Sequence, residues 1–180
     1  SFTGSTKVGK LVAARVAERL GKTLLELGGN NAVIIDETAD LNLAIQALTF
    51  GAIGTAGQRC TTIRRVFLQE NIFSTVLQRL INAYKTVKIG SPLDLQSHMG
   101  PLIDIDAVKQ FEQVIETLKK NGAKIECGGK RIRLLSKLAE EAGCFVEPTI
   151  VTNVKNDWPL VQTETFAPIL YLMPYKTLDE

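Results

Sequence analysis

The chain has 180 residues, of which 45% are hydrophobic and 22% charged, and its net charge is +2. The length fits one domain with one sizeable core, and the composition is that of an ordinary soluble globular protein. The basic residues are scattered, so they predict neither nucleic acid nor membrane as a partner. No apolar run approaches the ~20 residues needed to cross a bilayer. The chain starts at Ser1 without an initiator methionine or a signal peptide, so we expect a fragment boundary there.

The three cysteines, Cys60, Cys127 and Cys144, are an odd number and form no CxxC pair. That pattern argues against a disulfide framework and against a zinc site, and it favours a reducing compartment. We therefore expect a cytoplasmic protein that holds no metal.

In chain order, the first half alternates helices and short apolar runs. The expected elements are an amphipathic helix over Lys7–Leu20 ended by Gly21, apolar runs over Thr23–Leu27 and Ala32–Ile35, a helix N-capped by Asp40 that frays at Gly54–Gly57, a strand over Arg65–Gln69 and an amphipathic helix over Ile72–Val87.

The second half continues the alternation after a loop over Gly90–Pro101. The expected elements are a helix over Asp104–Asn121, a strand over Lys124–Cys127, a charged insertion over Arg131–Gly143 with a helix as one alternative, and strands over Phe145–Val151 and Ile169–Met173. Strands that alternate with helices predict one α/β domain built around a largely parallel sheet flanked by helices.

Cys60 is the first candidate for chemistry. It follows a glycine-broken helix end in a polar setting, and Arg59 beside it supplies positive charge. A thiol is a useful nucleophile only as the thiolate, which positive charge or backbone N–H groups stabilise. The alternative is a small buried side chain, which is the role we expect for Cys127 and Cys144 in the core.

Glu26 interrupts an apolar run and is followed by a double glycine. If its strand face is buried, the carboxylate is costly unless it is paired or protonated, and such a carboxylate suits a general base. The alternative is a glutamate at a strand end that faces the solvent.

Two further features give weaker evidence for a functional site. Small residues from Thr3 to Gly9 precede a helix, where free N–H groups could bind a pyrophosphate, although an ordinary N-cap at Ser5 or Thr6 explains them equally well. His98 is the only histidine, so it is the only possible partner for a Cys–His dyad.

Taken together, four motifs resemble the aldehyde dehydrogenase superfamily, in its order and across the whole chain. They are Phe2-Thr3-Gly4-Ser5-Thr6, Leu25-Glu26-Leu27-Gly28-Gly29, Gly57-Gln58-Arg59-Cys60 and Glu164-Thr165-Phe166-Ala167-Pro168. Details around Asn30-Asn31 and Thr61-Thr62 are most similar to the antiquitin branch, which oxidises α-aminoadipic semialdehyde in lysine breakdown.

The resemblance implies a role for each residue of these motifs. Cys60 attacks the aldehyde to form a thiohemiacetal and then a thioester, its own N–H helps to hold the oxyanion, and Glu26 activates the water that releases the acid. The implied NAD(P) contacts are Gly4 and Ser5 at the pyrophosphate, Gly9 completing the glycine spacing, Leu27 at the nicotinamide, Glu164 at its ribose and Phe166 packed nearby. Thr61 and Arg59 are the implied substrate contacts.

The resemblance also implies a homo-oligomer, a dimer or a tetramer, with NAD as cofactor and NADP as the other possibility. Relative to the family, the chain lacks the upstream half, with most of the dinucleotide-binding domain and an oxyanion-hole asparagine, and it lacks the C-terminal loop and oligomerisation strand. We therefore expect the isolated 180-residue chain to have little or no dehydrogenase activity. The competing readings are a cofactor-independent thiol acyl-transferase or thioesterase, and an inactive α/β fragment.

Overall fold

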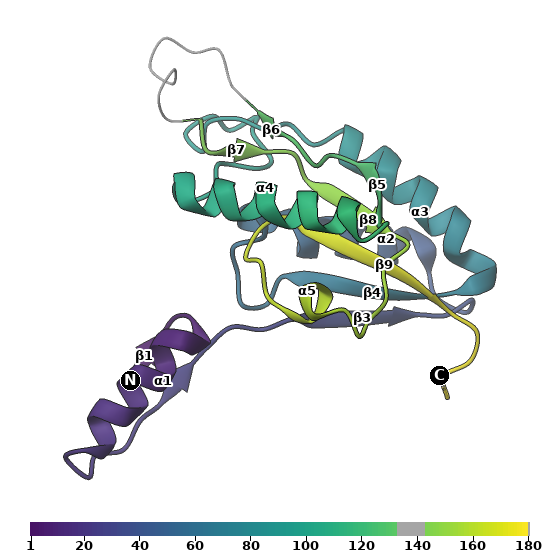
Figure 1. Cartoon of the computed structure of the whole chain (residues 1–180). Helices are drawn as coiled ribbons and strands as arrows, with labels where there is room; N and C mark the ends of the chain where they lie inside the picture. Colours follow the sequence, from purple (N-terminus) through teal and green to yellow (C-terminus); the bar gives the residue numbers. More distant parts are fainter. Residues whose placement is uncertain (133–142, 180) are drawn as a thin grey trace.

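The computed structural model describes residues 1–132 and 143–179 and contains a central sheet of five strands. In spatial order the strands are β3 (Asn31–Ile35), β4 (Ile63–Gln69), β9 (Ile169–Tyr175), β8 (Thr149–Thr152) and β5 (Lys124–Cys127). The first four run parallel, and only β5 at the edge is antiparallel to its neighbour. The expected α/β fold with a largely parallel sheet is confirmed (Figure 1).

Helices cover both faces of this sheet. They are α2 (Leu41–Ile53), α3 (Glu70–Lys85), α4 (Ile105–Lys120) and the short α5 (Pro159–Gln162). In Figure 1, α4 crosses the near face, while α2 and α3 lie behind the sheet. The core forms between these layers: Phe111 of α4, Leu48 of α2 and Val66 of β4 are each no more than 1% exposed.

Aspartates cap the starts of α2 and α4; the cap at Asp40 was predicted, whereas Asp104 was expected inside its helix and is instead the N-cap. The Asp40 carboxylate accepts hydrogen bonds from the N–H groups of Asn42 and Leu43, and the Asp104 carboxylate accepts one from Ala107. Each cap satisfies backbone donors that have no partner inside the helix. None of the helices in the described ranges is long and apolar enough to cross a membrane.

A separate N-terminal unit contains β1 (Phe2–Thr3), α1 (Thr6–Ala17) and β2 (Leu25–Glu26). The two strands pair in parallel, and the unit projects from the main body (Figure 1). The amphipathic helix predicted here is present, but it ends at Ala17, because Leu20 turns into the left-handed region with φ 57°. Its apolar side chains stay largely exposed, and only Gly9 of the helix is buried.

Two strand predictions also need correction. The single strand expected over Phe145–Val151 is two strands, β7 (Phe145–Val146), which pairs with β6 (Arg131–Ile132), and β8. Pro148 lies between them and has no N–H to donate to a ladder. The strand expected over Arg65–Gln69 is β4, and it begins two residues earlier, at Ile63. The predicted insertion after Ile132 lies outside the described residues between 133 and 142.

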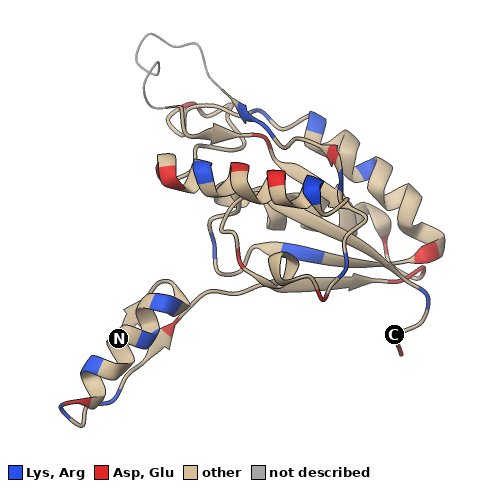
Figure 2. Ribbon diagram, in the orientation of Figure 1, with Lys and Arg blue, Asp and Glu red and all other residues tan. Residues whose placement is uncertain are grey.

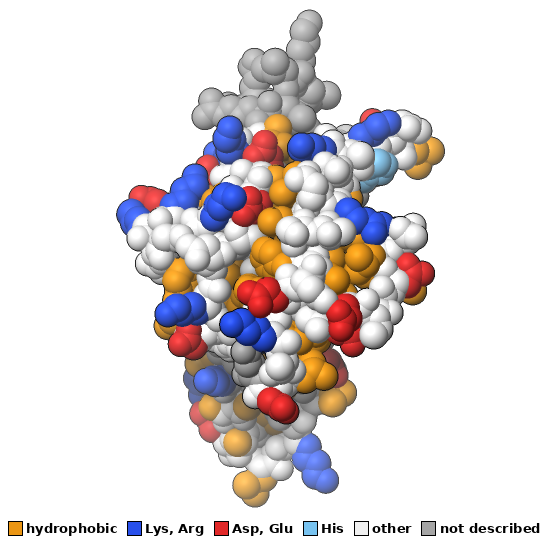
Figure 3. All heavy atoms as spheres, turned by 90° about the vertical axis from the view of Figure 1, so that its right-hand side faces the viewer, with side chains coloured by type: hydrophobic (Ala, Val, Ile, Leu, Met, Phe, Trp, Pro, Cys, Tyr) orange, Lys and Arg blue, Asp and Glu red, His pale blue; other side chains and the backbone are white. Residues whose placement is uncertain are grey.

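Charged residues are distributed over the whole molecule. Figure 2 shows acidic and basic residues on the N-terminal unit, along α4 and at strand ends. On the face shown in Figure 3, blue and red side chains are interspersed with hydrophobic ones. This face therefore carries no continuous area of a single charge.

Candidate active site

Cys60 lies in the turn that joins the short helix η1 (Gly54–Gly57) to β4, and it is exposed. The turn is closed by two hydrogen bonds between Arg59 and Thr62, one from the Thr62 N–H to the Arg59 carbonyl at 3.1 Å and one from the Arg59 N–H to the Thr62 hydroxyl at 3.2 Å. The thiol is therefore held at the surface rather than in the core.

Asn31 holds the same turn from the side of β3. Its Nδ2 donates to the carbonyl oxygen of Cys60 at 2.6 Å and to that of Thr62 at 3.0 Å. The Cys60 N–H donates to no other group in the part of the chain that the structure describes. The backbone around the sulfur is thus fixed, while one N–H donor beside it remains available.

Glu26 is the last residue of β2 and pairs with Thr3 of β1. Of the two alternatives left open by the sequence, the solvent-facing one holds, because β2 has only β1 beside it and the carboxylate is exposed. Glu26 and Cys60 line one cavity of about 650 Å³. Residues from the N-terminal unit and from the main sheet thus meet at this cavity.

Nearly all of the other predicted site residues reach the same cavity. Its lining includes Gly4, Ser5, Leu27, Arg59, Thr61, Glu164 and Phe166. The exception is Gly9, which is buried in α1 where an added Cβ would lie 2.5 Å from a methyl group of Leu27. Gly9 thus permits close packing of α1 against Leu27, the residue after β2, and the Ser5 hydroxyl caps α1 by accepting from the Val8 N–H at 3.3 Å.

Glu164 is held by partners from two other segments. Its Oε1 accepts from the Gly29 N–H at 3.3 Å and from Nη2 of Arg64 at 3.0 Å, and the Arg64 side chain is only 3% exposed. Burial lowers the pKa of Arg64, whereas the Glu164 carboxylate opposes that shift. Sequence reasoning missed Arg64, although alternation with Val66 and Leu68 would have placed it on the inner face of β4.

Three glycines allow these segments to approach one another. An added Cβ at Gly28 would lie 2.1 Å from Oε2 of Glu164, and one at Gly29 would lie 2.7 Å from the carbonyl oxygen of Cys60. Gly57 has φ +72°, and its Cβ would lie 2.4 Å from the backbone of Ala167. Side chains at these positions would push the site apart.

We expect Gly57→Ala to cost about 1–2 kcal/mol for its left-handed backbone plus a further cost of displacing Ala167. Gly122→Ala is the matched control, because Gly122 has φ +85° and nothing within 4 Å of an added Cβ. Urea denaturation of both variants measures the difference. Equal losses of unfolding free energy would contradict the close packing at Gly57.

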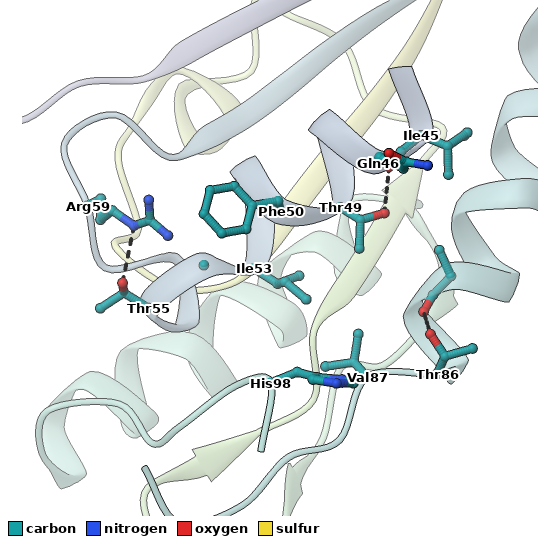
Figure 4. A pocket seen from close by; sticks show the side chains of 12 residues that line it. Ile45, Gln46, Thr49, Phe50, Ile53, Thr55, Arg59, Thr86, Val87 and His98 are labelled. Carbon is teal, nitrogen blue, oxygen red and sulfur yellow. Dashed lines mark hydrogen bonds between the residues drawn. The ribbon is translucent and has the colours of Figure 1, made fainter. Parts of the chain in front are cut away.

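The remaining candidates lie elsewhere. His98 is exposed, and its Nδ1 accepts from the Lys88 N–H. It lines a different cavity of about 520 Å³, which it shares with Arg59 and Phe50 but not with Cys60 (Figure 4). This placement gives no support to a Cys60–His98 dyad.

Cys127 and Cys144 are half-buried and pack against the core, as predicted. Burial raises the pKa of the Cys127 thiol, which disfavours its thiolate. Within residues 1–132 and 143–179, no group of three His, Cys, Asp or Glu side chains is arranged to hold a metal ion.

The fold and the cavity define an α/β protein with an exposed thiol and an exposed carboxylate at one site. The sequence model of a protein family, described as "Aldehyde dehydrogenase family", matches residues 1–180 of the chain. The chain therefore belongs to the aldehyde dehydrogenase family, as the four motifs predicted.

Individual relatives agree with this assignment. The chain is 51% identical over its whole length to α-aminoadipic semialdehyde dehydrogenase of Rattus norvegicus and covers 32% of that protein. It is 49% identical to a putative aldehyde dehydrogenase family 7 member A1 homolog of Dictyostelium discoideum, covering 34% of it. The chain thus spans about a third of the length of these relatives.

A solved structure is similar as well. Betaine aldehyde dehydrogenase from Staphylococcus aureus, crystallised in complex with NAD+, superimposes with a TM-score of 0.91 at 34% identity. The match covers 98% of this chain and 34% of that protein.

Proposed function

We propose that residues 1–180 form part of the catalytic domain of an NAD-dependent aldehyde dehydrogenase, with Cys60 as the nucleophile and Glu26 as the general base. The observation that carries the proposal is the shared cavity: an exposed thiol and an exposed carboxylate line it together with the residues proposed to bind the cofactor. The family of the chain and the named activities of its relatives support the same reaction.

The residues at the cavity fit a nicotinamide cofactor. Oε2 of Glu164 accepts no hydrogen bond within the described residues, so it is available to a ribose hydroxyl. Leu27 and Phe166 offer apolar surface beside it, and Gly4 and Ser5 stand at the start of α1, where the helix dipole favours a pyrophosphate. When bound, NAD+ would accept the hydride of the reaction.

The proposed chemistry begins at the sulfur. The Cys60 thiolate adds to the carbonyl carbon of the aldehyde, and the electron pair of the C=O bond moves to oxygen, giving a thiohemiacetal. The Cys60 N–H, which donates to no group within the described residues, is the proposed donor to this oxyanion. Loss of hydride from the same carbon leaves a thioester on Cys60.

Glu26 acts in the second half of the reaction. Its carboxylate takes a proton from water, the oxygen of that water adds to the thioester carbon, and the carbon–sulfur bond breaks to release the acid and the thiolate. The exposure of Glu26 keeps it in contact with the water that it must activate. A carboxylate can therefore serve where the chain offers no histidine at the cavity.

Arg59 and Thr61 flank Cys60 and are the proposed substrate contacts. The guanidinium of Arg59 lies 5.1 Å from the ring centre of Phe50, and its Nε donates to the Thr55 hydroxyl. Its other N–H groups are suited to a carboxylate on the substrate, as in a semialdehyde. We therefore propose an aldehyde of the α-aminoadipic semialdehyde type, from lysine breakdown. Use of NADP, assembly into a dimer or tetramer, and a cytoplasmic location stay predictions.

A chimera tests the function. The chain replaces the segment that it matches in the rat enzyme, and formation of NADH is followed with α-aminoadipic semialdehyde. We expect turnover by the chimera and little or none by the isolated chain. A folded chimera that binds NAD+ and forms no NADH would contradict the proposal, and thioester hydrolysis without cofactor would favour a thioesterase instead.

A further inference from the structure

Arg64 joins three segments that are distant in the sequence. Besides its ion pair with Glu164, its guanidinium donates to the carbonyl oxygens of Gly57 at 3.2 Å, of Arg59 at 3.1 Å and of Gly29 at 3.4 Å. It therefore contacts the turn that carries Cys60, the double glycine after Glu26 and the loop that carries Glu164.

The same guanidinium also lies against Phe166. The distance from its central carbon to the ring centre is 5.5 Å. Phe166 has φ 57°, a left-handed conformation that a phenylalanine rarely adopts without support from its neighbours. Both proposed cofactor contacts on this loop, Glu164 and Phe166, thus rest on one side chain.

The position of Arg64 separates it from direct chemistry. Its side chain is 3% exposed and does not line the cavity of Cys60. Its contacts with the turn are to carbonyls on the N-terminal side of Cys60, whereas Asn31 holds the carbonyls of Cys60 and Thr62. The two side chains together fix the backbone on both sides of the sulfur.

We infer that Arg64 is a positioning residue, which fixes the Cys60 turn and the Glu164 carboxylate relative to each other. Its positive charge also neutralises that carboxylate, so that the carboxylate does not repel the Cys60 thiolate. The inference rests on the proposed roles of Cys60 and Glu164. The planar guanidinium is suited to it, because its fixed fork of donors reaches several acceptors at once.

The test uses the full chain and needs no dehydrogenase activity. The rate of labelling by iodoacetamide is measured separately for Cys60, Cys127 and Cys144 by peptide mass spectrometry. The half-buried Cys127 and Cys144 report general loosening of the fold in the same sample. Arg79→Gln, on the surface of α3, is the control for loss of an arginine charge elsewhere.

We expect Arg64→Gln to slow the labelling of Cys60 about tenfold, because the half-buried Glu164 carboxylate at the same cavity loses its positive partner and its charge then opposes formation of the thiolate. Arg64→Lys keeps the charge and loses the fork, so an intermediate rate is expected. Adding Glu164→Gln to Arg64→Gln should restore the rate to within about threefold of the unsubstituted chain, because the uncompensated carboxylate is removed. A purely structural role would give no such restoration.

The outcomes separate the two proposals. If Cys60 of the unsubstituted chain labels no faster than Cys127 and Cys144, the proposed catalytic function fails. If Cys60 labels fast and Arg64→Gln leaves its rate unchanged, only the role of Arg64 is overturned. If Arg64→Gln accelerates all three cysteines through unfolding, Arg64→Lys decides: a rate equal to that of the unsubstituted chain overturns the inference.

Discussion

Cys60→Ala is expected to lower aldehyde oxidation by the chimera by at least about 10⁴-fold, because the acyl group then has no covalent anchor. The thiol is exposed at the cavity, so its removal leaves no hole in the core and should change the free energy of unfolding little. NADH absorbance measures the activity, and urea denaturation measures the stability.

Cys144→Ala is the matched control for this loss. Cys144 is half-buried beside the core and does not line the cavity, so its variant should keep most of its turnover. Equal turnover by Cys60→Ala and the parent chimera would overturn the covalent mechanism. A loss in both variants would point to a general sensitivity to cysteine replacement.

Glu26→Gln is expected to lower steady-state turnover by roughly 10²–10⁴-fold, the usual contribution of a general base. Its signature differs from that of Cys60→Ala. Because Glu26 is proposed to act only after the thioester forms, the variant should release one equivalent of NADH in a rapid burst and then stall. Stopped-flow absorbance detects the burst, and mass spectrometry detects the acyl adduct on Cys60.

Glu18→Gln serves as the control, because Glu18 lies in the same N-terminal unit, pairs with Arg15 on the surface and is absent from the cavity lining. Its turnover should match that of the parent. A Glu26→Gln variant without a burst would assign Glu26 to an earlier step, and one with full turnover would remove it from the mechanism.

Local signals predicted the main elements well. The helix capped by Asp40 and the strand over Lys124–Cys127 are found where the sequence placed them, because a capping side chain and a helix-ending glycine, here Gly122, act on their own neighbourhood. The end of α1 was predicted three residues too late, because Leu20 takes a left-handed conformation that is rare for leucine and is not indicated by its residue type.

The site was harder to predict because it depends on long-range contacts. The four motifs contain residues that line the cavity, but the sequence left open whether Glu26 is buried or faces the solvent, because nothing in its own strand shows that only one neighbouring strand lies beside it. Arg64 was overlooked for a similar reason. The strand was expected to start one residue after it, so the alternation of Val66 and Leu68 was not extended back to include its side chain on the inner face.

The junction between the N-terminal unit and the main body limits what stabilising substitutions elsewhere can achieve. Gly28 and Gly29 link the unit that carries the carboxylate to the body that carries the sulfur; a larger residue at Gly29 would meet the Cys60 carbonyl, and one at Gly28 would displace the Glu164 carboxylate. Glycine also gives a backbone its widest choice of conformations. Tighter filling of the sheet interior would thus raise the melting temperature without restraining the distance between acid and thiol.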